Sequence, residues 1–484
     1  MPLLNFILHF FPVTPRMNRS LSVVCLGLLA GCARFESKPL SAPGTASNLE
    51  SRALDSPELK SFLETNLHRD STSWPPKAWD FQMLTLVAFY FHPSLDVARA
   101  QWGVAQAGVE SAGGRPNPVL SVVPGYNLNP ASGISPWFPA VNLDIPIETA
   151  GKRGYRVAQA QQLSEVARLN IASVAWQVRS GVRTSLLDYA AARQHASLLQ
   201  RQLQLQREIV ALLEQRLQAG AIGRNELTPT RLVLARTESD FADATRLAVE
   251  ARVRIAESLG LPARAIDGIE FDPVLAVTAG VGTDLTSTEA RRRALLGRPD
   301  ILAALAEYAA SQSALQREIA KQYPDVHLNP GYQFDQGAEK LSLGISVELP
   351  VLNQNQGPIA EARAKREEAA ARFVALQAKI IADVDRALAA RGAAADQAAR
   401  QEKLVQMARE QAASVEAMRK AGAADKLDLA GAQLEAATGE LALVDAQIKT
   451  AQAIAQLEDA MRLPLEAWPT LERGHGPRAK QEKP

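Results

Sequence analysis

Histidine, cysteine and carboxylate side chains are the residues through which this 484-residue chain would do chemistry. Their spacing does not match that of known catalytic or metal-binding sites. The six histidines stand far apart, at positions 9, 68, 92, 195, 327 and 475. None has a neighbouring Cys or a pair of carboxylates at the spacing of a metal site or an acid–base pair. No Gly-rich phosphate loop follows a strand pattern, so ATP hydrolysis is not expected. We therefore expect no enzyme activity, no cofactor and no defined metal site.

Cys32 is the cysteine whose surroundings indicate a modification. Arg16 and Arg19 precede an apolar run over residues 21–29, and Leu29-Ala30-Gly31-Cys32 resembles a bacterial lipobox. This combination is typical of a lipoprotein signal peptide, here residues 1–31. We expect cleavage before Cys32 and lipidation, with palmitate among the acyl groups, of its thiol and new amino group. The alternative is a buried Cys in an N-terminal helix.

The residues around Cys32 add two expectations. The position after it holds Ala33 rather than the Asp that usually retains lipoproteins at the inner membrane. With Cys25 removed and Cys32 lipidated, no thiol remains for a disulfide or a redox role. Translation can start at Met1 or at Met17, because the positive charge of Arg19 and the apolar run survive either way.

Composition favours long helices and gives no basic excess that would bind an acidic partner. Lys plus Arg number 53 and Asp plus Glu 52, so nucleic acid is not an expected ligand. Aromatic residues make up only 5%, which suits long packed helices better than a compact core. No apolar run of helical membrane-spanning length follows the signal. If the mature chain enters a membrane, we expect it to do so by strands.

Four segments alternate apolar and polar residues, as strands with one oily and one wet face do. They cover residues 119–128, 139–147, 325–335 and 341–349, about the length a tilted strand needs to cross a bilayer core. The alternative is two amphipathic hairpins that cover a soluble core. The polar residues that we expect on the wet face are Asn142, Asp144, His327, Ser342, Ser346 and Glu348.

The pattern occurs twice along the chain. Pro124-Gly125-Tyr126 recurs as Pro330-Gly331-Tyr332 at an offset of 206, and Ala219-Gly220 recurs as Ala421-Gly422 at an offset of 202. A nearly constant offset over such a length indicates a tandem duplication. The order is a leader (32–80), a first repeat (81–262), a connector (263–290), a second repeat (291–464) and a polar tail (465–484). Pro39, Pro43 and Gly44 interrupt the leader, which is therefore expected to have little order.

Each repeat also contains a long helical hairpin. Residues 155–218 hold no Pro, which predicts a helix of roughly 95 Å at 1.5 Å per residue. Gly220 and Gly223 interrupt it, and a return helix is expected to end near residue 260. The second hairpin is expected over residues 358–462, with its turn at Gly422. The predicted class is mainly α, with four additional strands.

Four strands are too few to close a barrel, and open sheet edges are excluded from lipid because unpaired backbone groups are costly there. If the strands span a membrane, several copies must each contribute four. The polar strand faces would then surround a wet lumen, and the helical hairpins would continue it outside the bilayer. This combination predicts a conduit.

The chain resembles the TolC-type outer membrane efflux family over roughly residues 80–464. The resemblance rests on the lipobox, the duplicated strand and helix hairpins, Arg298-Pro299-Asp300, and the run from Leu349 to Ala360. It implies a homotrimer with a twelve-stranded outer membrane β-barrel and a periplasmic α-barrel. It also implies an outer membrane location, a periplasmic adaptor and an inner membrane pump, here of the resistance-nodulation-division type. Residues 147–153 and the Asn-Gln-Asn-Gln-Gly run are most similar to the CzcC-like heavy-metal branch.

The resemblance also implies roles at the helical turns. Gly220, Gly223 and Gly422 would lie at the periplasmic tip and contact the adaptor. Glu226 and Asp428 are candidate gate carboxylates, and the alternative for Asp428 is a charge that stabilises the start of its helix. Alternatives for the whole chain are a multidrug channel of the same family and a lipid-anchored periplasmic coiled-coil scaffold.

Overall fold

The computed structural model describes residues 35–68, 73–272, 285–335 and 337–465, so the predicted signal peptide and Cys32 lie outside the described residues. The chain divides into two units, Met1–Ser51 and Arg52–Pro484. In the first unit, helix α3 (Ala42–Glu50) begins after Ser41, whose hydroxyl accepts a hydrogen bond from the Gly44 N–H. The elements described in the following paragraphs belong to the second unit.

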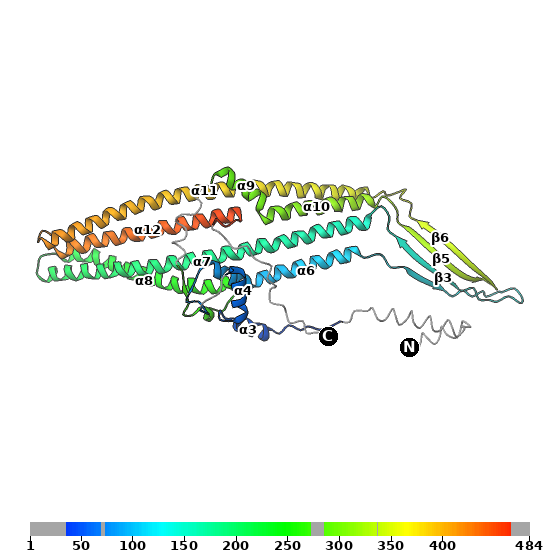
Figure 1. The fold of residues 1–484 in the computed structure, drawn as a ribbon, viewed down its shortest axis with the longest axis horizontal. Helices are drawn as coiled ribbons and strands as arrows, with labels where there is room; N and C mark the ends of the chain where they lie inside the picture. The colour runs from blue at the N-terminus through cyan, green and yellow to red at the C-terminus, as the bar shows by residue number, and fades with distance from the viewer. Residues whose placement is uncertain (1–34, 69–72, 273–284, 336, 466–484) are drawn as a thin grey trace. The chain divides into compact units, whose positions relative to one another are not determined.

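A four-stranded antiparallel sheet lies at one end of this unit (Figure 1). Its strands are β2 (Val119–Val123), β3 (Ala140–Ile147), β5 (Val326–Asp335) and β6 (Ala338–Val347), in the order β2-β3-β5-β6. The first repeat supplies β2 and β3, and the second supplies β5 and β6. The two predicted hairpins therefore pair side by side through β3 and β5.

Two strands, β2 and β6, have bounds that differ by two or more residues from those predicted. β2 ends at Val123 rather than at residue 128, because Pro124 has no N–H to donate to the ladder. Only an isolated bridge between Tyr126 and Trp137 continues it. β6 spans residues 338–347 rather than 341–349, and Gly337 directly before it has φ 103°, a value that glycine adopts without strain.

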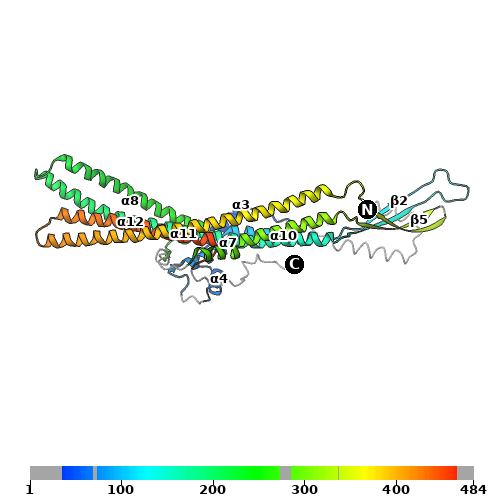
Figure 2. The same cartoon turned by 90° about the horizontal axis from the view of Figure 1, so that it is seen from above.

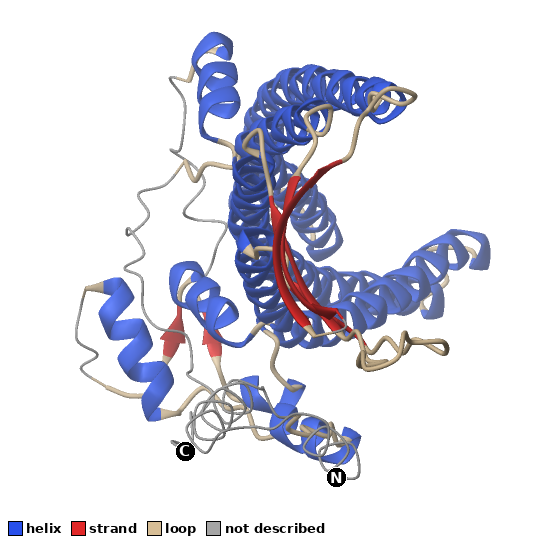
Figure 3. Ribbon diagram, turned by 90° about the vertical axis from the view of Figure 1, so that its right-hand side faces the viewer, coloured by secondary structure: helices blue, strands red, loops and turns tan. Residues whose placement is uncertain are grey.

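Each strand joins a helix, and the helices keep the order of the strands. α6 (Pro93–Gly113) precedes β2, α7 (Lys152–Gln218) follows β3, α10 (Pro299–Ala320) precedes β5, and α11 (Gln356–Lys420) follows β6. Near the sheet these helices contact one another in the order α6–α7–α10–α11. Seen from the sheet end, the sheet is curved and the helices follow the same curve (Figure 3).

The helical hairpins extend away from the sheet. α8 (Arg224–Leu259) returns along α7, and α12 (Lys426–Met461) returns along α11, which gives the order α8–α7–α12–α11 (Figures 1 and 2). α7 has 67 residues and is roughly 100 Å long. Leu199, Leu203 and Val210, at helical spacings of four and seven residues, are buried along it. None of the described helices is both long enough and apolar enough to cross a membrane.

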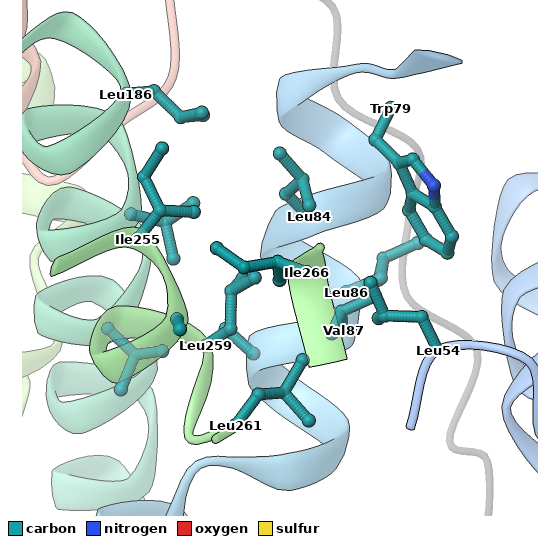
Figure 4. Close-up of a cluster of buried hydrophobic side chains, with 14 of the residues drawn as sticks. Leu54, Trp79, Leu84, Leu86, Val87, Leu186, Ile255, Leu259, Leu261 and Ile266 are labelled. Atoms are coloured by element: carbon teal, nitrogen blue, oxygen red, sulfur yellow. The ribbon is translucent and has the colours of Figure 1, made fainter. Parts of the chain in front are cut away.

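A compact apolar core surrounds the middle of α7 (Figure 4). It is built by α4 (Pro57–Leu67), β1 (Ala78–Trp79), α5 (Phe81–Phe91), the 3-10 helix η1 (Ala263–Ile266) and β4 (Glu270–Phe271), with β1 parallel to β4. The prediction of a low-order leader over residues 32–80 is wrong for this part. Leu59, Leu63 and Trp79 are almost fully buried, and that burial holds the leader in place. The predicted connector contains η1, β4 and the start of α9 (Ser287–Gly297), and residues 273–284 lie outside the described part.

Buried charges join the two repeats where α12 ends. Glu458 is fully buried and accepts hydrogen bonds from Arg179 (3.0 Å) and Arg183 of α7. Both guanidinium groups also lie over the ring of Phe81, at 5.0 and 5.2 Å from its centroid. This cluster was not predicted from the sequence. Its available signal was a pair of arginines four residues apart within an otherwise uncharged helical segment.

The motif Arg298-Pro299-Asp300 lies at the end of α12 as well, and its hydrogen bonds there explain its structural role. The buried Arg298 guanidinium donates to both Asp300 oxygens, at 3.0 and 2.6 Å, and to the Ala460 carbonyl at 2.5 Å. Burial alone would raise the pKa of Asp300, but Arg298 outweighs it and holds that pKa below its usual value. The motif fixes the start of α10 to the last turn of α12.

Candidate functional site

The predicted wet-face residues lie together on one face of the sheet. Asn142 is opposite Gly331, which is opposite Ser342, and His327 is opposite Ser346. Residues directly opposite each other share a face. Asp144 Oδ1 lies 2.9 Å from His327 Nδ1, and Asn329 Nδ2 donates to Ser346 Oγ at 3.1 Å. The polar side chains thus form hydrogen bonds along this face.

Close contacts at Gly331 explain why glycine is the middle residue of the duplicated Pro-Gly-Tyr triplet. A Cβ on Gly331 would lie 2.4 Å from Asn142 Oδ1 and 2.8 Å from Ser342 Oγ, which real structures do not tolerate. At its repeat counterpart Gly125, a Cβ would lie 2.3 Å from the Phe138 ring. Both glycines let a neighbouring side chain lie across the strand.

The opposite face of the sheet is apolar and uncovered. Leu341 is 86% exposed and Leu343 71% exposed. Contiguous exposed apolar patches of this kind mark contact with a partner or a membrane. On this face, the exposed apolar residues of the two outer strands are Leu120, Val122, Leu341, Leu343, Ile345 and Val347.

A charged joint connects β3 and β5 to α7. Lys152 Nζ lies 2.7 Å from Asp325 Oδ1, and the Thr149 N–H donates to the same oxygen at 2.9 Å. Burial alone would raise the pKa of Asp325, but these donors outweigh it and keep that pKa below its usual value. Arg156 and Glu148 form a second ion pair, at 2.6 Å. Residues 147–153 therefore hold the sheet and the helix together.

Glu348 lies beside this joint, just after β6. With Glu148, Arg156, Asp325 and His327 it lines a cavity of about 400 Å³. The structure thus brings Glu348 to the polar end of the sheet, near the other predicted wet-face residues. The joint residues Lys152 and Asp325 were not singled out from the sequence. The available signal was an Asp directly before β5 and a Lys at the start of the helix that follows β3.

The Asn-Gln-Asn-Gln-Gly run forms the matching joint of the second repeat. Asn355, at φ 61°, precedes α11, and its side-chain amide donates to the Glu318 carbonyl at 2.7 Å. Glu318 in turn pairs with Lys321 at 2.8 Å. Asn tolerates this left-handed conformation better than most residues. The run therefore fixes the direction in which α11 leaves the sheet.

Both predicted helical turns lie at the end of the hairpins farthest from the sheet (Figure 1). Gly220 has φ 70° and Gly422 has φ 77°, the left-handed region that glycine enters without strain. Gly223 has φ −89° and is instead the residue before α8. A positive φ therefore favours glycine at positions 220 and 422, whereas the backbone at Gly223 is open to other residues.

The two candidate gate carboxylates cap the return helices. The Glu226 carboxylate accepts from the Gly223 N–H at 3.2 Å, and the Asp428 carboxylate accepts from the Asp425 N–H at 2.9 Å. Asp425 completes a reciprocal capping box with Asp428 and pairs with Arg216 of α7. The structure thus gives both carboxylates a helix-start role at equivalent positions of the two repeats.

The described histidines are dispersed. His195 Nε2 lies 2.7 Å from Asp445 of α12, His327 contacts Asp144, and His68 and His92 flank helices α4 and α6. His9 and His475 lie outside the described residues. Within the described ranges, no group of three or more His, Cys, Asp or Glu side chains is arranged to hold a metal ion.

Comparisons with known proteins agree with this architecture. The family model for "Outer membrane efflux protein" matches residues 91–261 and 278–461. The cobalt-zinc-cadmium resistance protein CzcC of Cupriavidus metallidurans is 26% identical over 238 residues, which cover 48% of this chain and 55% of CzcC. The chain therefore matches only about half the length of that relative.

Two solved structures share the fold. The outer membrane protein VceC of Vibrio cholerae has a TM-score of 0.64 at 19% identity, covering 80% of this chain and 97% of VceC. The open state of the MtrE outer membrane channel of Neisseria gonorrhoeae has a TM-score of 0.63 at 19% identity, covering 80% of this chain and 89% of MtrE. The predicted fold class and the resemblance to TolC-type efflux proteins are confirmed. Because the family model spans both duplicated halves, the chain belongs to the outer membrane efflux protein family.

Proposed function

We propose that this outer membrane efflux channel exports heavy-metal cations, received from an inner membrane pump through a periplasmic adaptor. The observation that carries the proposal is the sheet, which has a hydrogen-bonded polar face and a bare apolar face, and whose strands each join a long helix. β2 and β6 are open edges, which lipid does not tolerate. Three copies would close a ring of twelve strands.

The metal cargo is supported by the similarity to CzcC, which is named as a cobalt-zinc-cadmium resistance protein. The energy for export would come from the pump, of resistance-nodulation-division type. The test is a strain from which the gene is deleted, challenged with cobalt, zinc and cadmium salts and with apolar drugs and dyes. We expect sensitivity to the metals, restored by the intact gene. Sensitivity to the drugs alone would favour the multidrug alternative, and normal resistance to both would contradict an export role.

The helical tip is proposed as the adaptor contact, at Gly220, Gly223 and Gly422, with Glu226 and Asp428 as gate carboxylates. Gly422→Val places a β-branched residue at φ 77°, which strains the turn. We expect export to be lost while the amount of protein in the outer membrane stays normal. Gly431→Val is the matched control, because Gly431 is exposed within α12 and has open space around it. Full metal resistance in Gly422→Val would remove this turn from the coupling mechanism.

Cys32 is proposed as the site of a covalent lipid, because it follows a lipobox-like sequence. Cys32→Ser is expected to abolish incorporation of a fatty-acid analogue and lipoprotein-type processing. Partial resistance should survive, because the strands themselves would hold the protein in the membrane. Labelling that persists in Cys32→Ser would show that the lipid is attached elsewhere or that the lipobox interpretation is wrong.

A further inference from the structure

The helical layer near the tip has one inner seam and two outer edges. α7 and α12 form the inner seam, whereas α8 and α11 lie at opposite edges of the layer (Figure 1). Across the seam, Gln202 Nε2 donates to the Ala437 carbonyl at 3.0 Å, and the two residues are 6% and 1% exposed. Neighbouring helices of one chain therefore bury these positions.

The tandem duplication gives both outer edges a copy of that seam. The residues 202 positions away from Gln202 and Ala437 are Leu404 on α11 and Ala235 on α8. Leu404 is 52% exposed, and Ala235 is also exposed. The edges thus present the counterparts of a buried interface without its partner. Further exposed apolar side chains on these edges are Leu232, Val233 and Met407.

Charged residues give the seam its register. Glu440 of α12 pairs with Arg409 of its own hairpin, at 2.8 Å, and with Arg201 of α7 across the seam, at 3.2 Å. A carboxylate between two guanidinium groups is a specific three-charge arrangement. The Glu440 side chain is only 14% exposed.

The first repeat contains two of the three charges, the carboxylate and one of its basic partners. Glu238 of α8 pairs with Arg207 of α7 at 2.9 Å, and these residues stand 202 positions before Glu440 and Arg409. The residue 202 positions after Arg201 is Lys403, which is exposed on α11 and has no ion-pair partner among the described residues. The Glu238 side chain, at 47%, is correspondingly more exposed than that of Glu440.

We propose that Lys403 of one copy pairs with Glu238 of the next copy and completes this three-charge arrangement between chains. The inference rests on the assembly of several copies in the proposed function, and it specifies the surface and register by which they meet. Within one chain α7 and α12 separate Lys403 from Glu238, so the partner is a second copy. An α11 edge that binds an α8 edge is a head-to-tail contact, and such contacts form a ring when the rotation between copies closes. Opposite charges at the edges and the exposed apolar residues beside them fit this partner.

The test uses a carbodiimide, which joins a Lys amine to a carboxylate only where the two are in contact. The purified full-length protein in detergent is treated, separated by gel and analysed by peptide mass spectrometry. We expect covalent dimers and trimers that contain a cross-linked peptide joining Lys403 to Glu238. Lys403→Arg should abolish that peptide while the assembly keeps its size by light scattering, because a guanidinium keeps the ion pair but does not form the amide. Lys379→Arg is the matched control, since Lys379 pairs with Asp383 of its own helix.

The outcomes separate this inference from the proposed function. An assembled oligomer without the Lys403–Glu238 peptide, or with that peptide only in the monomer band, overturns the inference and leaves the channel intact. A protein that is monomeric in detergent and in native membranes overturns both. As a second measurement, Lys403→Glu places like charges at the edge and should lower the temperature at which the oligomer dissociates, whereas Lys379→Glu should not.

Discussion

Glu458→Ala is expected to lower the free energy of unfolding by about 3–5 kcal/mol, the cost of removing one partner from a buried ion pair. Glu458 is fully buried and accepts from two guanidinium groups, those of Arg179 and Arg183. Its second oxygen, Oε1, accepts from the Leu465 N–H at 2.8 Å. The variant therefore keeps two positive charges in the core after their shared carboxylate has gone. Thermal unfolding of the detergent-solubilised protein, followed by circular dichroism, measures the loss.

The control for Glu458→Ala is Glu165→Ala on α7. Glu165 pairs with Arg168 on the same helix, and both side chains are largely exposed. Exposed pairs of this kind contribute about 0–1 kcal/mol, so the control should unfold close to the wild type. Equal effects of the two substitutions would show that the buried cluster does not stabilise the junction between the repeats.

Leu343→Arg is expected to reduce assembly into the outer membrane strongly, because it places a charge on the apolar face of β6. A charge against hydrocarbon costs about 2–4 kcal/mol near the bilayer midplane. Leu343 lies opposite Pro330 and is 71% exposed in the single chain. The amount of heat-modifiable protein in outer membrane fractions measures the effect.

Ser342→Arg, one residue away, is the matched control on the polar face. Ser342 lies opposite Gly331, on the face that also holds Asn142. The long side chain of the introduced arginine can extend into water, so we expect normal assembly with altered conductance in planar bilayers. Assembly defects of equal size on the two faces would contradict a sheet with one lipid face and one wet face.

The sequence by itself determined the features that depend on neighbours along the chain. Alternation assigned residues such as Leu343 and Ser342 to opposite faces, because successive side chains of a strand point to opposite sides. Gly220 and Gly422 were found at the turns, because left-handed backbone strongly favours glycine. The duplication was visible because its offset is nearly constant.

Only the tertiary structure decided which distant segments meet. Glu458 contacts residues almost 280 positions earlier, and no local pattern marks such a pair. The leader was predicted to have little order because Pro and Gly residues interrupt it, yet Leu59 and Trp79 are buried against helices from far along the chain. Asp428 was predicted from the sequence as a gate carboxylate or as a charge at the start of its helix. The structure adds that its carboxylate accepts a hydrogen bond from the Asp425 N–H. Local patterns specify dihedral angles and faces, whereas burial and ion pairing depend on how the chain packs in three dimensions.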